Sequence, residues 1–138
     1  MRNYTMMKIL FLSAAFIAMV LSGCEKPAGQ GGDATIKGKV WVEDWDKNFN
    51  LLQYEFAGAD QDVYIIYGDD VNYGDKISTN NNGEFEFKYL RKGKYKIYVY
   101  SDQNQSSSTP ASQVAIVVNT EISSKKQTVD IGTIIIKK

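Results

Sequence analysis

Residues 79–99, TNNNGEFEFKYLRKGKYKIYV, contain the pattern that decides the fold class. Apolar and polar side chains alternate in two runs within this stretch, and a period of two is typical of β-strands with one buried face. The Asn82-Gly83 pair before the first run tolerates the positive φ angles of a tight hairpin turn, and Gly93 suits the short loop before the second run. The stretch therefore predicts an antiparallel meander through residues 76–100.

The same alternation recurs elsewhere in the chain, and no window after Cys24 shows the i, i+3, i+4 apolar spacing of a helix. Seven strands in about 100 residues are typical of two packed antiparallel sheets. We therefore expect an all-β, seven-stranded antiparallel β-sandwich, with a β-bulge at Gly132 in the last strand. The expected strands lie at residues 35–43, 62–67, 76–79, 84–90, 94–100, 113–119 and 128–137.

Alternation also assigns the aromatic side chains to faces of the sheets. It places Phe85, Phe87, Tyr89 and Tyr95 toward the core. Aromatic residues beside polar ones on an outward face are common at surfaces that bind sugars or proteins, although cross-strand packing explains them without any ligand. Four large aromatic residues fall on outward faces: Trp41, Tyr64, Tyr98 and Tyr100.

A family resemblance rests on the order of motifs within residues 79–99. A Thr is followed by an Asn-Gly turn, an alternating Phe strand, Leu90, and then Gly93-x-Tyr95 before a second alternating strand. This order resembles the prealbumin-like family, which includes carboxypeptidase regulatory-like domains and collagen-adhesin B-type repeats. The resemblance implies a prealbumin-like β-sandwich. Members of this family are mostly non-catalytic modules for spacing, adhesion or recognition, so it points to function only weakly.

The N-terminal residues have the layout of a secretory signal. Arg2 and Lys8 accompany an apolar stretch at residues 9–21, which is too short to cross about 30 Å of hydrocarbon. Leu21-Ser-Gly-Cys24 follows, and small residues before a cysteine at this place resemble the bacterial lipobox. The resemblance implies that Cys24 becomes the new N-terminus and carries diacylglycerol and a further acyl chain, such as palmitate. An ordinary signal peptide, or a short anchor helix, with an incidental cysteine is the alternative.

These features divide the chain into three parts. We expect residues 1–23 to be a lipoprotein signal peptide, residues 24–34 to be a lipidated, glycine-rich tether, and residues 35–138 to be the β-sandwich domain. Several acyl chains on one residue give stable attachment to a lipid bilayer. The expected location is therefore the cell envelope, at the outer membrane, with the leaflet left open.

Composition excludes several classes of function. The chain has 16 basic and 16 acidic residues, and this balance argues against a nucleic-acid-binding surface. It has no histidine and one cysteine, which excludes Ser-His-Asp and Cys-His catalysis and disulfides within the chain. An acidic pair could still serve as a catalytic acid and base, but a domain this small, without long active-site loops, rarely builds a substrate cleft. We therefore expect no enzyme activity and no resident cofactor.

The expected loop at residues 44–61 contains oxygen side chains at the spacing of an EF-hand calcium loop. The sixth position of such a loop requires Gly for a sharp turn, but Phe49 occupies it here. The preceding residues also predict a strand where a helix is required. We favour a solvated loop whose Asp and Asn side chains form Asx-turns, with calcium binding as the alternative. The candidate metal ligands are Asp44, Asp46, Asn48 and Glu55.

The same loop is the candidate interaction site, because it is longer than a sandwich connection requires and points away from the expected membrane anchor. Its candidate ligand-binding residues are Trp45, Phe49 and Tyr54. An equal alternative is that Phe49, Leu51 and Phe56 fold back and close the open end of the sandwich.

The leading functional hypothesis is a membrane-anchored, non-catalytic recognition or accessory module. It would bind a glycan or an envelope protein through the loops farthest from the membrane. The alternatives are a structural spacer or envelope-assembly subunit without a small ligand, and a calcium-stabilised, adhesin-like domain.

Overall fold

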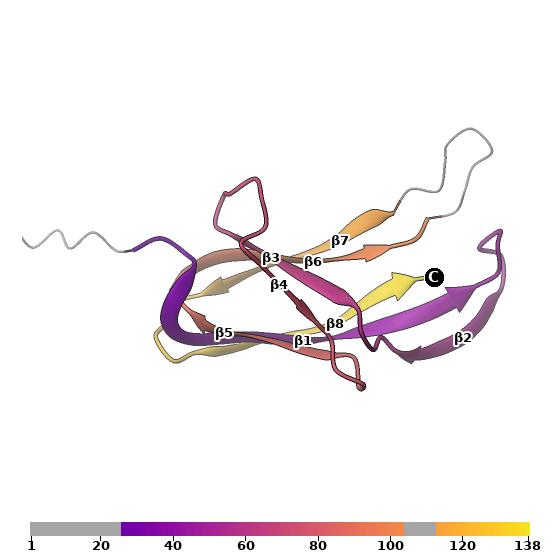
Figure 1. The fold of residues 1–138 in the computed structure, drawn as a ribbon, viewed down its shortest axis with the longest axis horizontal. Helices are drawn as coiled ribbons and strands as arrows, with labels where there is room; N and C mark the ends of the chain where they lie inside the picture. The colour runs from indigo at the N-terminus through magenta and orange to yellow at the C-terminus, as the bar shows by residue number, and fades with distance from the viewer. Residues whose placement is uncertain (1–25, 104–112) are drawn as a thin grey trace, which may run out of the picture.

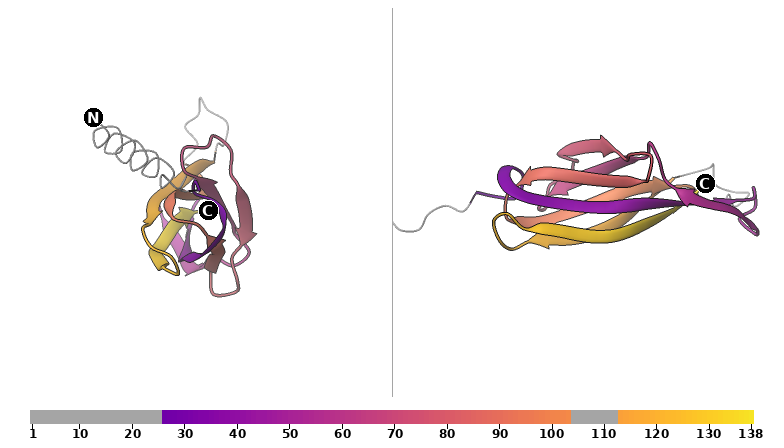
Figure 2. Two further views of the ribbon diagram at one scale, coloured as in Figure 1. Left: turned by 90° about the vertical axis from the view of Figure 1, so that its left-hand side faces the viewer. Right: turned by 90° about the horizontal axis from the view of Figure 1, so that it is seen from below.

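The computed structural model describes residues 26–103 and 113–138, which form eight β-strands in two layers, as Figure 1 and Figure 2 show. No helix among these residues has the length and apolar character needed to cross a membrane. The strands are β1 (Gln30–Trp45), β2 (Leu52–Ala57), β3 (Asp62–Tyr67), β4 (Asp75–Ser78), β5 (Glu84–Leu90), β6 (Gly93–Ser101), β7 (Val114–Ile122) and β8 (Thr128–Lys137).

Strand β1 is the centre of the first sheet. Strand β8 pairs with it in parallel along one edge. Along the other edge β5 pairs with β1 as far as Lys39, and β2 pairs with it from Trp41 onward, so β5 and β2 lie end to end. The second sheet has the order β4-β3-β6-β7, and all of its pairs are antiparallel. The all-β sandwich is thus confirmed.

The core lies between the two sheets and consists of alternate residues along the strands, as the sequence pattern predicts. Phe85, Phe87 and Tyr95 are buried as expected. With this core and about 110 residues, residues 26–138 are large enough to fold as an independent domain. The buried hydrophobic residues are Ala34, Ile36, Val40, Val42, Val63, Ile65, Phe85, Phe87, Leu90, Tyr95, Ile97, Val99, Ile122, Ile134 and Ile136.

Tyr89 does not face the core, contrary to its expected position. Its side chain is 72% exposed, and its φ of 60° places it in the left-handed region. The pairing of β1 with β5 is irregular here, since Gln30 and Ala34 both lie opposite Leu90. This irregularity shifts the alternation by one residue, so that Leu90 rather than Tyr89 is buried.

The expected meander through residues 76–100 is wrong. Strand β4 belongs to the second sheet, β5 to the first, and β6 to the second again. The connections at residues 79–83 and 91–92 therefore cross between the layers and do not close hairpins. Alternation predicts which face of a strand is buried, but it does not specify which strand lies beside it.

The structure has one strand more than the seven expected, because Leu52–Ala57 forms β2 within the expected loop at 44–61. Strand β2 pairs with the last part of β1, and the resulting hairpin projects from the end of the sandwich (Figure 1). The parallel β1–β8 pair is a second departure from the expected antiparallel arrangement.

The bulge expected at Gly132 is confirmed. Gly132 has a φ of 75°, and the register between β1 and β8 shifts beside it, between Lys37 and Lys39. The extra residue shifts the alternation of β8 by one position. Val129 and Ile131 pack against the core before the bulge, and Ile134 and Ile136 are buried after it.

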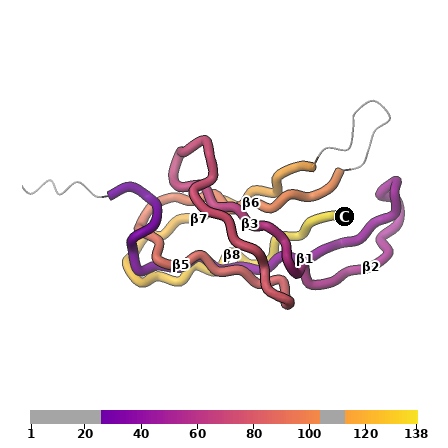
Figure 3. The backbone as a smooth tube through the Cα atoms, viewed as in Figure 1, coloured from indigo at the N-terminus to yellow at the C-terminus, as the bar shows by residue number. Residues whose placement is uncertain are grey.

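The N-terminal segment is bound to the domain at the end where β5 leads into β6 (Figure 3). The Arg91 side chain donates a hydrogen bond from Nε to the Pro27 carbonyl at 2.8 Å. The Tyr95 hydroxyl donates to the Arg91 carbonyl at 2.6 Å and accepts from the Gly29 amide at 3.0 Å. Of the expected tether, residues 24 and 25 lie outside the described residues, whereas residues 27–29 are held in place and β1 begins at Gln30.

Gly83 is required by the turn at Asn80–Gly83. Its φ is 76°, its amide donates to the Asn80 carbonyl at 2.9 Å, and its carbonyl accepts from the Val40 amide at 2.7 Å. Asn82 is not in a positive-φ conformation, so the expected tight hairpin turn, with both Asn82 and Gly83 at positive φ, does not form. A side chain at Gly83 would collide with the Val40 carbonyl oxygen.

We expect Gly83→Ala to lower the free energy of unfolding by more than about 1 kcal/mol beyond the effect of Gly68→Ala. The two glycines share a positive φ, but a side chain at Gly68 would meet no atom within 4 Å. Gly68→Ala therefore reports the backbone strain alone. Urea denaturation of residues 26–138 measures both values, and equal midpoints would contradict the close packing at Gly83.

Candidate functional site

Four tyrosines form a cluster on the outer face of the second sheet, and we call it the tyrosine platform. Tyr64 comes from β3, Tyr98 and Tyr100 come from β6, and Tyr73 comes from the β3–β4 loop. Tyr64 and Tyr98 lie opposite each other on neighbouring strands, and their rings stack with centroids 4.8 Å apart. Tyr73 and Tyr100 pack edge-on against Tyr64 at 5.2 Å and 5.6 Å.

The platform is partly open to solvent. Tyr73 is 54% exposed and Tyr100 is 39% exposed, while Tyr64 and Tyr98 are half-buried beneath them. Burial raises the pKa of the Tyr64 and Tyr98 hydroxyls above the ordinary 10.0, so both remain protonated hydrogen-bond donors into the alkaline range. Sequence alternation predicted three of these residues to face outward, but it gave no sign that Tyr73 joins them from a loop.

Charged and polar side chains border the platform. The Lys76 ammonium lies 2.8 Å from the Asp62 carboxylate and 5.8 Å from the centroid of the Tyr64 ring. Ser78 donates a second hydrogen bond to Asp62 at 3.2 Å. The hydrogen bond from Lys76 lowers the pKa of Asp62, so this carboxylate stays ionised as an acceptor beside the rings.

A polar groove of about 480 Å³ adjoins the platform. Tyr64 and Tyr100 form part of its wall, and Gln61, Asp62 and Gln113 supply amide and carboxylate groups to its lining. Together the platform and the groove offer aromatic surface beside hydrogen-bonding groups, which is the chemistry of sites for small polar ligands.

The structure does not bring the predicted ligand-binding residues Trp45, Phe49 and Tyr54 onto one face. Trp45 lies on the outer face of the first sheet, where its indole donates to Glu43 at 3.1 Å and the Lys137 ammonium lies 4.7 Å from its ring centroid. Tyr54 lies opposite Asp44 in the β1–β2 hairpin and is 69% exposed. Phe49 is half-buried in the hairpin turn, with a φ of 55°.

The alternative role of this segment as a closing plug is wrong for two of its three residues. Leu51 is 64% exposed and Phe56 is 48% exposed, because the β1–β2 hairpin extends beyond the second sheet. The hairpin therefore presents apolar side chains to solvent.

The candidate calcium ligands are divided among three local structures. Asp44 lies in β1 and Glu55 in β2, while Asp46 and Asn48 lie in the turn between them. The Asp46 carboxylate accepts from the amides of Asn50 and Leu51 at 2.6 Å and 3.0 Å. These amides lie four and five residues on, so Asp46 closes the hairpin turn but does not form the expected Asx-turn, which bonds the amide two residues on. Within residues 26–103 and 113–138, no three acidic or sulfur-bearing side chains gather as metal ligands.

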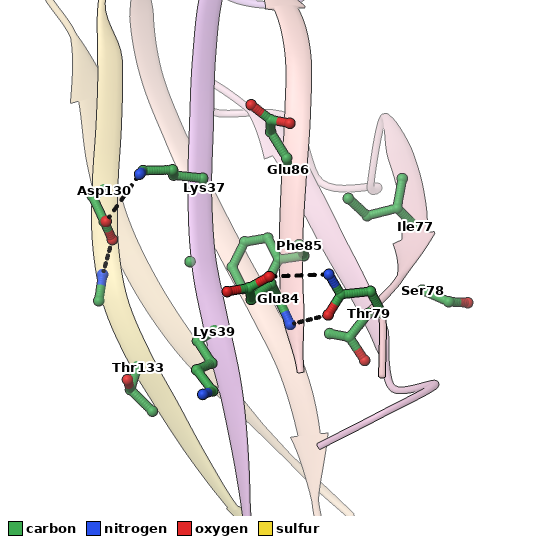
Figure 4. A pocket seen from close by; sticks show the side chains of 13 residues that line it. Lys37, Lys39, Ile77, Ser78, Thr79, Glu84, Phe85, Glu86, Asp130 and Thr133 are labelled. Carbon is green, nitrogen blue, oxygen red and sulfur yellow. Dashed lines mark hydrogen bonds and ion pairs between the residues drawn. The ribbon is translucent and has the colours of Figure 1, made fainter. Parts of the chain in front are cut away.

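A second, charged groove lies across the outer face of the first sheet (Figure 4). Its volume is about 850 Å³, and its charged side chains alternate in sign from strand to strand: Asp130 on β8, Lys37 and Lys39 on β1, and Glu84 and Glu86 on β5. Lys37 and Asp130 form an ion pair at 3.5 Å, with both side chains about half exposed. Exposed pairs of this kind contribute little free energy, and the groove lacks an aromatic surface comparable to the platform.

Comparisons with known proteins yield structural likenesses only. Neither the family models nor the curated protein sequences contain a match to this chain. Among solved structures, the chain is similar to a putative carbohydrate-binding protein from Pseudomonas aeruginosa, with a TM-score of 0.48 and 13% identity, over 80% of this chain and 92% of that chain.

Two further likenesses cover larger proteins. A minor pilin of Streptococcus agalactiae has a TM-score of 0.43 and 16% identity, over 81% of this chain and 45% of that chain. An (S)-allantoin synthase has a TM-score of 0.43 and 12% identity, over 77% of this chain and 42% of that chain. The chain therefore spans less than half of each of these two proteins. At such identities no function is carried over from them.

We predict that the domain loses stability at alkaline pH, because several of its tyrosines are buried. Burial raises the pKa of Tyr64, Tyr67, Tyr95 and Tyr98 above the ordinary 10.0. The folded state holds these protons more tightly than the unfolded state. The contribution of the four tyrosines to the free energy of unfolding is therefore complete below pH 10.0 and is lost as the pH rises through the raised pKa values.

Urea midpoints measured on both sides of pH 10.0 should show this loss, together with delayed formation of tyrosinate absorbance. The double variant Tyr64→Phe/Tyr98→Phe should show a smaller decline above pH 10.0. A midpoint that stays constant through the alkaline range would contradict the raised pKa values.

Proposed function

We propose that this chain is a non-catalytic binding domain that binds a glycan at the tyrosine platform and the adjoining polar groove. One observation carries the proposal: four packed tyrosine rings lie beside a groove lined by amide and carboxylate groups. The C–H faces of a sugar ring pack on aromatic surface, and its hydroxyls bond to amides and carboxylates.

The position of the platform supports this role. Three of its four tyrosines lie on β3 and β6, the two central strands of the second sheet. A site on paired strands is held more rigidly than a site on loops. The groove extends toward Gln113 and Lys138, at the end of the sandwich that bears the C-terminus and lies opposite the N-terminal segment (Figure 1).

We expect Tyr73→Ala and Tyr100→Ala each to weaken glycan binding by about tenfold or more, because both remove exposed aromatic surface from the platform. A glycan array probed with residues 26–138 would identify a ligand, and titration calorimetry would measure its affinity. Tyr89→Ala is the matched control, because Tyr89 is 72% exposed on the first sheet. Retention of full affinity in both platform variants, or no glycan bound by the unmodified domain, would contradict the proposal.

A protein partner at the β1–β2 hairpin is the second candidate function. The hairpin projects from the sandwich and exposes Leu51, Tyr54 and Phe56, with Trp45 on its opposite face and Phe49 in its turn. Exposed apolar side chains on a projecting element favour a contact with another protein. Tyr54→Ala would weaken that contact and leave glycan binding at the platform unchanged, so the two candidates are distinguishable.

We further propose that the domain is a lipoprotein of the outer membrane, attached through Cys24. The support is the lipobox-like Leu21-Ser-Gly-Cys24 after an apolar stretch, in a part of the chain that lies outside the described residues. The N-terminal segment leaves the domain at one end, so an anchor there would direct the polar groove away from the bilayer.

Cys24→Ala should abolish incorporation of labelled palmitate in a bacterial host, because Cys24 is the single cysteine of the sequence. Ser22→Thr serves as a control that keeps both Cys24 and the preceding apolar stretch, so its chain should still incorporate the label. Label that persists in the Cys24→Ala chain would contradict the lipoprotein assignment.

A further inference from the structure

A basic pocket lies at the end of the sandwich where the chain enters the domain. It has a volume of about 370 Å³ and brings together three segments that are distant in sequence: the N-terminal segment, the β5–β6 connection and the β7–β8 connection. Four basic side chains and one acidic side chain line it: Lys26, Arg91, Lys92, Lys125 and Asp33. Its charge is therefore strongly positive, although the whole chain is neutral.

Backbone contacts fix the shape of this pocket. Arg91 donates from its amide to the Gly29 carbonyl at 2.8 Å and from its side chain to the Pro27 carbonyl at 2.8 Å. Gly32, in the pocket wall, lies so close to Leu90 that a side chain there would collide with the Leu90 carbonyl. The β5–β6 connection that carries Arg91 is thus held against the N-terminal segment by the fold itself.

The position of the pocket indicates its occupant. Pro27 is fixed to the domain and lies three residues after Cys24, a stretch that spans at most about 11 Å. If Cys24 is the membrane anchor, as proposed above, this end of the domain lies within reach of the lipid headgroups. A positively charged surface at that distance attracts anionic lipids.

We propose that the basic pocket binds anionic phospholipid headgroups of the bilayer that holds the anchor. This inference rests on the proposed lipid attachment. Each basic residue close to an anionic surface strengthens attachment about fivefold. The acyl chains would then fix the protein to the membrane, and the pocket would set the orientation of the domain on it.

Co-sedimentation of residues 26–138 with vesicles tests the proposal, since this part of the chain lacks Cys24 and its acyl chains. We expect sedimentation with vesicles of phosphatidylcholine and phosphatidylglycerol, but not with vesicles of phosphatidylcholine alone. The double variant Lys26→Glu/Lys125→Glu should bind the anionic vesicles more than about tenfold more weakly. It leaves Arg91, which holds the N-terminal segment, unchanged.

The double variant Lys47→Glu/Lys138→Glu is the matched control, because it changes the net charge equally at the other end of the sandwich. Lys47 lies in the turn between β1 and β2, and Lys138 follows β8 at the C-terminus. Its binding should stay within about twofold of the unmodified domain, since salt screens charges over about 10 Å. Equal losses in the two double variants, or equal binding to neutral vesicles, would overturn the proposal. Palmitate labelling of Cys24 is a separate measurement, so failure of the anchor and failure of the pocket are distinguishable.

Discussion

The pairing of β1 with strands on both of its edges is the interaction on which the rest of the structure depends. Strand β1 comes first in the folded domain and β8 comes last, and the two pair in parallel over most of their length. The first sheet is therefore complete only when the two ends of the domain meet. Because the extra residue beside Gly132 shifts the alternation of β8 by one position, Ile134 and Ile136 enter the same core as Ile36 and Val40.

Because β1 is long, its two halves take part in different regions of the molecule. Its first half pairs with β5 and packs against the core. Its last residues extend beyond the second sheet and pair with β2 in the β1–β2 hairpin. The apolar side chains of that hairpin are exposed for this reason, and not because a loop failed to fold. The second sheet leaves its outer face uncovered, so tyrosines that alternate away from the core gather there instead of packing under another layer.

Sequence alternation was sufficient to locate elements but not to pair them. Three strands, at residues 62–67, 84–90 and 128–137, have the predicted bounds. Strand β2 was missed although Leu52, Tyr54 and Phe56 alternate there, because the Asp and Asn residues around Asp46 suggested a loop. The assignment of β4 and β5 to different sheets was not predictable, since Thr79 turns the chain by hydrogen bonds to residues 58 and 61, about twenty positions away. For the same reason, the platform appears only when Tyr64 meets Tyr98 across two strands and Tyr73 joins from a loop.

Strand β6 connects the two proposed sites and sets the distance between them. It begins at Gly93, directly after the basic residues Arg91 and Lys92, and it carries Tyr100 near its other end. Arg91 and Tyr100 are nine positions apart, which corresponds to about 30 Å of extended chain. A glycan on the platform would therefore be held well clear of headgroups at the basic pocket, and both sites could be occupied together. Because β6 is hydrogen-bonded to β3 and β7 on its two edges, this separation is a fixed property of the fold and does not depend on a flexible linker.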